Sequence, residues 1–294
     1  MLRRVVTFFK LVPLVLLIAV LPACTGESAQ DASRAYANPT AQVPILMYHD
    51  FREEAVPGNN VVMSVATFRV HMQAIYDRGF STVTFRCLID FVDYGTPLPP
   101  NPIVITFDDG YMSNLIYAAP ILEEFGLRAT INVIGISRGR ITYRGTDIPI
   151  IPHFGWDDVR PWVERGVIQI GHHSYDMHRW HRLPGEPWRY GVLPMEGECD
   201  EAYKEALTAD FERLRNIIYE ELGKGVYVFA YTYGLYNAQA EEILQGLGVR
   251  VTLSVHADTN TIVQGDPGSL FLLNRLNMTE GVDIDRLLDY LHTR

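Results

Sequence analysis

Short apolar runs alternate with amphipathic segments along most of this chain of 294 residues. Short runs that are rich in Val, Ile, Phe and Tyr are typical of buried strands. From residue 43 onward the pattern predicts strands at 43–48, 81–85, 103–107, 129–134, 167–170, 226–231, 249–255 and 270–276.

Segments with a helical period lie between these runs. In "ATFRVHMQAIYDRG" the residues Phe68, Met72, Ile75 and Tyr76 share one face, and Gly79 is suited to end a helix. The same kind of pattern predicts helices at 66–79, 115–126, 200–223, 238–248 and 283–294.

Strand–helix alternation indicates an α/β fold with a mostly parallel sheet. The seven or eight units of this pattern predict a deformed (β/α) barrel, in which catalytic side chains lie where the strands end. Two connections, 135–154 and 179–199, are long and rich in Gly, Pro, Arg and aromatic residues. Loops of this length at the mouth of a barrel are more often functional than idle.

The N-terminus has the layout of an export signal. A basic start is followed by an apolar stretch, 11–21, and by small residues before Cys24. "LPAC" resembles a bacterial lipobox, which predicts removal of residues 1–23 and lipidation of Cys24; ordinary secretion and an uncleaved anchor stay open. Residues 24–42 are small and polar, which predicts a flexible tether before a folded domain at 43–294. We therefore expect an exported lipoprotein on the outer face of the cell membrane, or a secreted protein.

The charge balance excludes one class of partner. The formal net charge is −10, and removing residues 1–23 takes away three of 25 basic residues and none of 35 acidic ones, which leaves −13. A chain with this charge binds nucleic acid poorly, so we expect no nucleic-acid partner. Neutral or cationic partners suit it better.

Polar side chains stand within three residues of the ends of several predicted strands. They are Asp108 and Asp109, His172 and His173, His49, and Tyr233. In a β/α barrel these positions lie on one rim. Asp and His side chains that converge there suit a divalent metal ion, whose charge would also compensate the two adjacent carboxylates.

The segment "GHHSYDMH" supplies neutral ligands for such an ion. His173 and His178 are five positions apart, so they lie about 140° apart around a helix and cannot share a helical face. Met177 occupies the helical i+4 position instead. The segment is therefore expected to be a loop that brings both imidazoles to one point.

These residues carry a resemblance to a known family. From Val43 to the C-terminus the chain resembles the polysaccharide deacetylases (NodB homology, carbohydrate esterase 4), and within them the branch of the poly-N-acetylglucosamine deacetylases. The motifs that carry the resemblance are "TFDDGY", "HSYDMH", "FAYTYG", "LMYHD" and "RATINVIG". The resemblance implies a NodB-like deformed barrel and a hydrolase that removes N-acetyl groups from N-acetylglucosamine units of a polysaccharide.

The resemblance also implies roles for single residues. Asp109, His173 and His178 would hold the metal ion, with zinc expected and cobalt or nickel left open. Asp108 would be the general base. The backbone N–H of Tyr233 would stabilise the oxyanion, although Thr232 stands where the family motif usually has proline.

Further site residues have two interpretations each. His49 is expected to be the general acid, as in the poly-N-acetylglucosamine branch, with His256 as the alternative. Arg275 either orients Asp108 through its charge or is a solvated arginine at the rim. Trp156 either stacks on a sugar face or packs against the protein.

We therefore expect a monomeric, metal-dependent enzyme that acts on an N-acetylated polysaccharide, with the particular glycan left open. Two other functions stay possible. One is a glycoside hydrolase that uses Asp108 with another carboxylate, although adjacent residues do not readily place two carboxyl groups across a glycosidic bond. The other is a glycan-binding lipoprotein with a degenerate site, which Thr232 and the lack of the family's late histidine favour.

Overall fold

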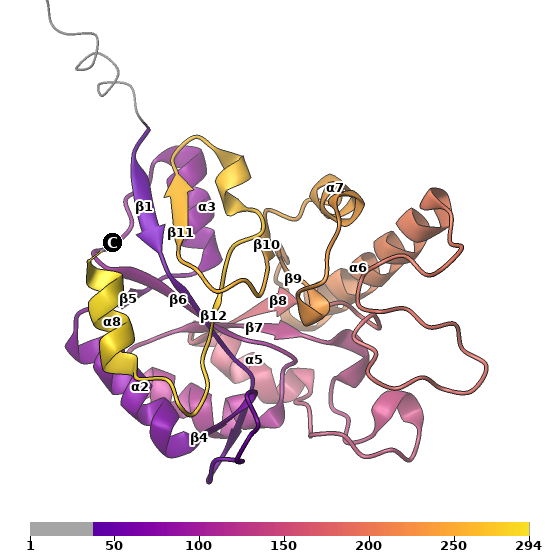
Figure 1. Cartoon of the computed structure of the whole chain (residues 1–294), viewed down its shortest axis with the longest axis horizontal. Helices are drawn as coiled ribbons and strands as arrows, with labels where there is room; N and C mark the ends of the chain where they lie inside the picture. Colours follow the sequence, from indigo (N-terminus) through magenta and orange to yellow (C-terminus); the bar gives the residue numbers. More distant parts are fainter. Residues whose placement is uncertain (1–37, 294) are drawn as a thin grey trace, which may run out of the picture. The chain divides into compact units, whose positions relative to one another are not determined.

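A curled sheet forms the centre of the part of the protein that the computed structural model describes, residues 38–293 (Figure 1). The signal segment 1–23, Cys24 and most of the predicted tether lie outside the described residues. The order of the sheet is β10-β9-β8-β7-β6-β2-β12, with β5 paired to β6, and every one of these pairs is parallel. A single parallel bridge joins Leu253 at the end of β10 to Leu273, three residues before β12 begins.

The strands of this sheet are short. Their bounds are β2 Ile45–Tyr48, β5 Ser81–Thr82, β6 Pro102–Phe107, β7 Ala129–Val133, β8 Ile168–His172, β9 Val228–Ala230, β10 Val251–Leu253 and β12 Leu276–Asn277. Two small sheets flank it: β1 Thr40–Val43 pairs antiparallel with β11 Asn260–Val263, and β3 Asp50–Arg52 pairs with β4 Val62–Ser64.

Helices connect the strands, as the alternating pattern predicts. Their bounds are α2 Val65–Asp77, α3 Phe85–Tyr94, α4 Ala119–Glu124, α5 Trp156–Glu164, α6 Asp200–Leu222, α7 Ala238–Gly246 and α8 Ile284–His292. A π-helical turn, η1 Asn114–Ala118, leads into α4, and 3₁₀ turns lie at η2 Gly135–Ser137, η3 Tyr143–Gly145, η4 Thr232–Gly234 and η5 Pro267–Leu270. The α/β class and the deformed NodB-like barrel are thus confirmed.

Three local differences from the sequence prediction have physical reasons. The run 43–48 is divided at Pro44, which lacks an N–H for a sheet ladder, so β1 pairs with β11 while β2 enters the central sheet. Residues 40–42, assigned above to the tether, are the start of β1. The run 81–85 ends early because the Thr84 side chain accepts a hydrogen bond from the Cys87 N–H and caps α3.

Aromatic packing fixes the ends of the two strands that lead into the predicted site. Tyr48 at the end of β2 contacts Phe68 of α2 edge-to-face, with ring centroids 5.3 Å apart. Phe107 at the end of β6 contacts the Tyr48 ring at 5.9 Å and the Phe51 ring at 5.4 Å. These rings are fully buried, so the ends of β2 and β6 are held rigidly, and with them the residues that follow Tyr48 and Phe107.

Among the described residues, none of the helices combines the length and the apolar character that crossing a membrane requires.

Candidate active site

The polar residues singled out above gather at the carboxyl ends of neighbouring strands. Asp108 and Asp109 follow β6, and His173 follows β8, two strands away in the sheet. His49 follows β2, which pairs with β6, and Tyr233 lies just after β9. The parallel sheet therefore brings together segments that are far apart in sequence.

Asp109, His173 and His178 form the centre of this site. The Oδ1 atom of Asp109 lies 3.6 Å from Nε2 of His173 and 3.4 Å from Nε2 of His178. One ligand atom from each residue lies within 4.8 Å of the others. Among the described residues, Asp109 Oδ1 is buried without a hydrogen-bond partner, which is costly for a carboxylate oxygen unless a cation or water satisfies it.

The imidazole of His173 is oriented by the neighbouring strand. Its Nδ1 lies 2.7 Å from the backbone carbonyl of Ala230 in β9. A proton on Nδ1 would donate to this carbonyl and leave the Nε2 lone pair directed at Asp109. Burial lowers the pKa of His173, which favours the neutral ring that a metal ligand requires.

A loop, not a helix, places His178, as the spacing predicts. Ser174 has a left-handed backbone with φ of 69°, and the N–H groups of Tyr175 and Asp176 each donate a 2.7 Å hydrogen bond to the Asp210 carboxylate of α6.

The side chain of His172 points to the opposite face of the sheet from His173, because successive side chains of a strand alternate. Its ring stacks between Phe211 and Phe229. It is fully buried and has no part in the centre.

Arg138 holds the turn that carries Asp109 through hydrogen bonds to its backbone. Asp109 and Gly110 have φ of 69° and 78°, and Arg138 Nη2 donates to their carbonyls at 2.8 Å and 3.0 Å. A side chain on Gly110 would collide with this guanidinium, since an added Cβ would lie 2.5 Å from Arg138 Nη1. Burial lowers the pKa of Arg138 to about 9, with the Asp109 carboxylate acting in the opposite direction.

Two side chains hold the neighbouring carboxylate, Asp108. Arg275 Nη1 and Asn132 Nδ2 each donate a 2.8 Å hydrogen bond to its Oδ1. Burial would raise the pKa of Asp108, but Arg275, together with the nearby His173 and His49, outweighs burial and holds that pKa well below its usual value. Both bonds end on Oδ1, which leaves Oδ2 to accept a proton.

The two candidates for the general acid lie in different surroundings. The electrostatic interaction with His49 lowers the pKa of both Asp108 and Asp109, so its ring is within electrostatic reach of the centre. Asn114 fixes the backbone there by donating a 2.7 Å hydrogen bond to the His49 carbonyl. His256 is exposed, and its closest described ring contact is with Tyr236 at 6.5 Å.

Tyr233 closes the site on the side of β9. Its backbone is left-handed, with φ of 57°, within a 3₁₀ turn in which Gly234 and Leu235 donate their N–H groups back to Tyr231 and Thr232. Neither of these two hydrogen bonds uses the backbone N–H of Tyr233. Its ring lies 4.4 Å from the ring of His178, which places the residue beside the centre.

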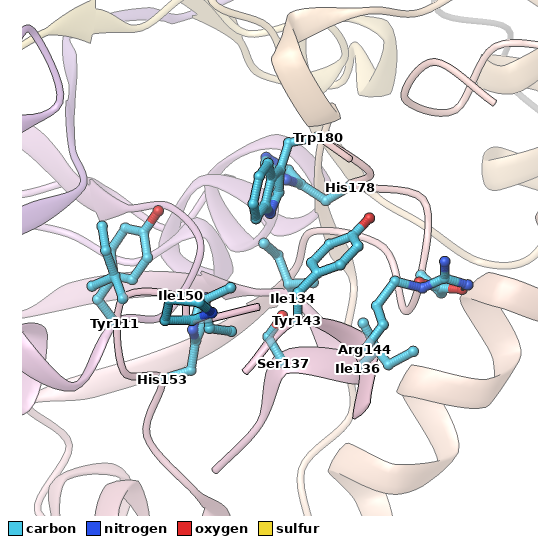
Figure 2. Close-up of a pocket in the computed structure, with 13 residues that line it drawn as sticks. Tyr111, Ile134, Ile136, Ser137, Tyr143, Arg144, Ile150, His153, His178 and Trp180 are labelled. Carbon is cyan, nitrogen blue, oxygen red and sulfur yellow. The ribbon is translucent and has the colours of Figure 1, made fainter. Parts of the chain in front are cut away.

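Trp156 is the predicted site residue that the structure places elsewhere. It begins α5 and packs, half-buried, against the main hydrophobic core. It does not line the pocket beside His178, a cavity of about 280 Å³ whose walls include Tyr111, Tyr143 and Trp180 (Figure 2). Of the two interpretations given for Trp156, the packing one agrees with this position.

Four residues that contact Asp109, its neighbour Asp108 or the loop before His178 were not identified from the sequence. Tyr111 donates a 2.7 Å hydrogen bond to Asp109 Oδ2, and Asn132, Arg138 and Asp210 make the contacts described above. Asn132 carried the clearest signal, because it is a polar residue inside the predicted strand 129–134 and must find a buried partner there.

Comparisons with known proteins support the fold and identify the family. Solved structures with the same fold include a de-N-acetylase from Aggregatibacter actinomycetemcomitans, with a TM-score of 0.72, 20% identity and coverage of 85% of this chain and 100% of that one. They also include IcaB from Ammonifex degensii, with a TM-score of 0.66, 22% identity and coverage of 85% and 97%.

A sequence relative is the poly-beta-1,6-N-acetyl-D-glucosamine N-deacetylase of Escherichia coli K12, which is 23% identical over 253 residues. The match covers 79% of this chain but only 38% of that enzyme. The family model of the polysaccharide deacetylases matches residues 95–252, more than half of the chain. The chain therefore belongs to the polysaccharide deacetylase family.

Proposed function

We propose that this deacetylase is a metal-dependent hydrolase that removes N-acetyl groups from N-acetylglucosamine units of an extracellular or cell-wall polysaccharide and releases acetate. The observation that carries the proposal is the buried, unpartnered Asp109 Oδ1, which faces the Nε2 atoms of His173 and His178. Asp108 stands beside it with its orientation fixed by Arg275.

The donor set fits a zinc ion. One carboxylate and two neutral imidazoles are typical zinc ligands, and three protein ligands leave positions open for water and substrate. When bound, such an ion would supply a Lewis acid that activates water and draws electron density from the acetamide carbonyl. Cobalt and nickel suit the same ligands.

The protein's own residues would handle the protons and the developing charge. Asp108 would take a proton from the attacking water at its free Oδ2. Negative charge on the former carbonyl oxygen would be stabilised by the N–H of Tyr233. As the amide C–N bond breaks, the departing amine would take a proton from His49, so that acetate and a free amine result.

The cellular location is part of the proposal. The signal-like residues 1–23 and Cys24 support export and lipid anchoring to the outer face of the membrane, and the formal charge of −13 after cleavage would not repel a product that gains amines. We also propose that the protein works as a monomer. Labelling with a radioactive fatty acid tests the anchor, because Cys24→Ser should abolish incorporation.

An acetate-release assay over defined glycans tests the activity. The panel contains β-1,6-linked and β-1,4-linked N-acetylglucosamine polymers and peptidoglycan. We expect acetate from at least one of them, and we expect Asp108→Asn to abolish it while the protein still binds zinc. The matched control is Asp157→Asn, because the Asp157 side chain is 97% exposed on α5 and contacts nothing in the site.

The assay also separates the two other functions. Cleavage of the polymer without acetate would favour a glycoside hydrolase, which family membership already disfavours. Glycan binding without any product in the wild type would favour a binding protein.

A further inference from the structure

A cavity with basic walls lies at the amino ends of the strands, at the other end of the sheet from the proposed metal ligands. Its volume is about 400 Å³, and we call it the amino-end cavity. Its walls include Arg128 just before β7, Ile168 at the start of β8 and Tyr227 just before β9. The proposed metal ligands follow the carboxyl ends of β6 and β8, so the length of the strands separates the two places.

The cavity exists because β8 and β9 are aligned at one position only. His172, at the carboxyl end of β8, is aligned with Phe229, whereas β7 and β8 are aligned over five positions. Among the described residues, the amino end of β8 therefore has no strand partner on the side of β9. Thr84, which caps α3, and Arg86 in the first turn of that helix line the space that results. Strands and a helix, not only loops, thus frame the cavity.

The charges around this cavity differ from those of the rest of the chain. Arg86, Arg128 and Lys224 line it, and no Asp or Glu does. Acidic residues outnumber basic ones 35 to 25 in the whole chain, and most of the described arginines form ion pairs with carboxylates. Arg86 does so with Asp90 at 3.0 Å, but Arg128 and Lys224 form no ion pair among the described residues. Two positive charges at the cavity are therefore uncompensated.

Neutral polar groups stand beside these cations. The Gln169 amide and the Tyr227 hydroxyl belong to half-buried residues that line the cavity, and neither makes a hydrogen bond to another described residue. Burial raises the pKa of Tyr227, so its hydroxyl keeps its proton and can donate. Partly enclosed polar groups without a partner in the protein are suited to bind oxygen atoms of a ligand.

A phosphate group with an attached polyol suits this set of side chains. Arginine and lysine bind phosphate oxygens through charge-assisted hydrogen bonds. The first turn of α3, which carries Arg86, adds the positive end of a helix dipole. A volume of about 400 Å³ lies within the range of ligand pockets and leaves room for more than the phosphate itself. The neutral Gln169 and Tyr227 would then face hydroxyl groups.

We propose that the amino-end cavity is a binding site for a phosphorylated polyol. Arg128 and Lys224 hold the phosphate group, and Gln169 and Tyr227 bind hydroxyl groups of the polyol. Soluble glycerol or sugar phosphates and the glycerol phosphate headgroup of an anionic lipid share this chemistry. The site is separate from the deacetylation centre, so the inference does not rest on the proposed function.

A lipid headgroup is one source because of where the chain enters the domain. β1 Thr40–Val43 leads through Pro44 directly into the amino end of β2, so the segment from Cys24 joins the domain at the end that carries the cavity. The 15 residues from 25 to 39 can span up to about 50 Å, so a lipid on Cys24 alone would leave the orientation of the domain open. A bound headgroup would turn the proposed metal ligands away from the membrane.

Calorimetry tests the site with residues 24–294 carrying Cys24→Ser, which has no attached lipid. We expect sn-glycerol 3-phosphate to bind more tightly than inorganic phosphate, and glycerol not to bind. The double variant Arg128→Gln with Lys224→Gln should weaken binding at least roughly tenfold, because it removes two charged donors. It should leave acetate release unchanged.

The matched control is Arg140→Gln with Lys204→Gln. It makes the same change in charge at two exposed residues, one in the loop after β7 and one near the start of α6, that do not line the cavity. We expect it to bind sn-glycerol 3-phosphate as the wild type does. Equal weakening in the two double variants would overturn the site in favour of general attraction between charges.

Vesicles distinguish the two sources of the ligand. The same protein is sedimented with vesicles of phosphatidylcholine alone and of phosphatidylcholine mixed with phosphatidylglycerol. Binding to the mixed vesicles that the Arg128→Gln with Lys224→Gln variant loses, and the control variant keeps, would support a lipid headgroup as the ligand. Binding of sn-glycerol 3-phosphate without vesicle binding would support a soluble ligand.

The remaining outcomes contradict the proposal. No binding of sn-glycerol 3-phosphate, inorganic phosphate or mixed vesicles by the wild type would overturn it. Equal affinity for glycerate, the carboxylate counterpart, would show that the cavity does not select phosphate. Because acetate release is measured on the same proteins, failure of this site leaves the proposed deacetylase activity untouched.

Discussion

Arg275 donates a 2.8 Å hydrogen bond to Asp108 across 167 residues of sequence. Both side chains are buried, with 0% and 4% of their surface exposed. Arg275 Nε also donates to the carbonyl of Ser254 at 2.8 Å, just after β10. The pair therefore connects the end of β6 to the segment just before β12. It holds the Asp108 carboxylate in position and in its ionised form.

Arg275→Met should destabilise the protein and shift its pH dependence. Removing one partner of a buried ion pair costs about 3–5 kcal/mol in the free energy of unfolding, which urea denaturation measures. Without Arg275, only His173 and His49 oppose the effect of burial, so the pKa of Asp108 should rise relative to the wild type and the acid limb of the pH–rate profile should move to higher pH. In the wild type the low pKa of Asp108 stabilises the fold at neutral pH, and this contribution is lost only as the pH falls through that pKa.

The control for this substitution is Arg286→Met, because Arg286 is exposed on α8. If Arg275→Met matched Arg286→Met in both unfolding free energy and pH profile, the pair would not have the role given to it.

Arg138 should set the metal affinity although it binds no metal itself. Its hydrogen bonds to the carbonyls of Asp109 and Gly110 hold a left-handed turn that most residues disfavour. Arg138→Met should weaken zinc binding by a factor of about 10–100, as is typical when a contact that orients a ligand is lost. Competition with a fluorescent chelator measures this, and Arg140→Met, an exposed arginine two residues away, is the matched control. Equal zinc affinity in the two variants would show that the hydrogen bonds from Arg138 do not set the metal affinity.

The two candidate acids can be separated by substitution. His49→Ala should lower kcat by a factor of about 10²–10⁴, the usual range for loss of a general acid, and leave zinc binding intact. His256→Ala should leave kcat nearly unchanged, because that ring is exposed. A large loss in His256→Ala with a small one in His49→Ala would reverse the assignment.

Asp210 should give the protein a distinct dependence of stability on pH. Burial raises the pKa of Asp210 to about 6 from its model-compound value of 3.8, against the N–H groups of Tyr175 and Asp176, which lower it. Because the folded state holds this proton more tightly than the unfolded state, ionisation of Asp210 destabilises the fold as pH rises from about 4 to above 6. The shift corresponds to about 3 kcal/mol.

Asp210→Asn cannot ionise, so its unfolding free energy should lack this fall. The variant cannot accept both N–H bonds and should be less stable at every pH, but its deficit relative to the wild type should shrink between pH 4 and pH 7. Urea denaturation across this range provides the measurement. A constant deficit would show that Asp210 does not titrate there.

The centre of the site could be predicted because the barrel brings strand ends together. Asp109 and His173 stand two and three residues after the ends of apolar runs, and the five-residue spacing to His178 excluded a helix. No detail of packing was needed, since strand ends of a parallel sheet lie on one rim wherever they occur in sequence.

The surroundings of the centre were beyond the sequence pattern for specific reasons. Arg138 lies in a long loop rich in arginine, and only the path of that loop shows that this guanidinium folds under Asp109. The sequence around Trp156 is the same whether its ring packs against the protein or stacks on a sugar, so the pattern alone did not decide between the two. Helix α5 was missed because Pro161 lies inside it, and the start of β1 was missed because its partner is distant: Gln42 contacts Thr261, 219 residues away.

The central claim is that Asp109, His173 and His178 hold one ion on which deacetylation depends, and a metal titration of the chelator-treated protein tests it most directly. Acetate release and bound zinc are followed together as zinc is added. We expect no acetate without metal, full activity at about one equivalent of zinc, and neither zinc binding nor activity in His178→Ala. Acetate release that continues at full rate in the metal-free protein, or tight zinc binding by His178→Ala, would contradict the account.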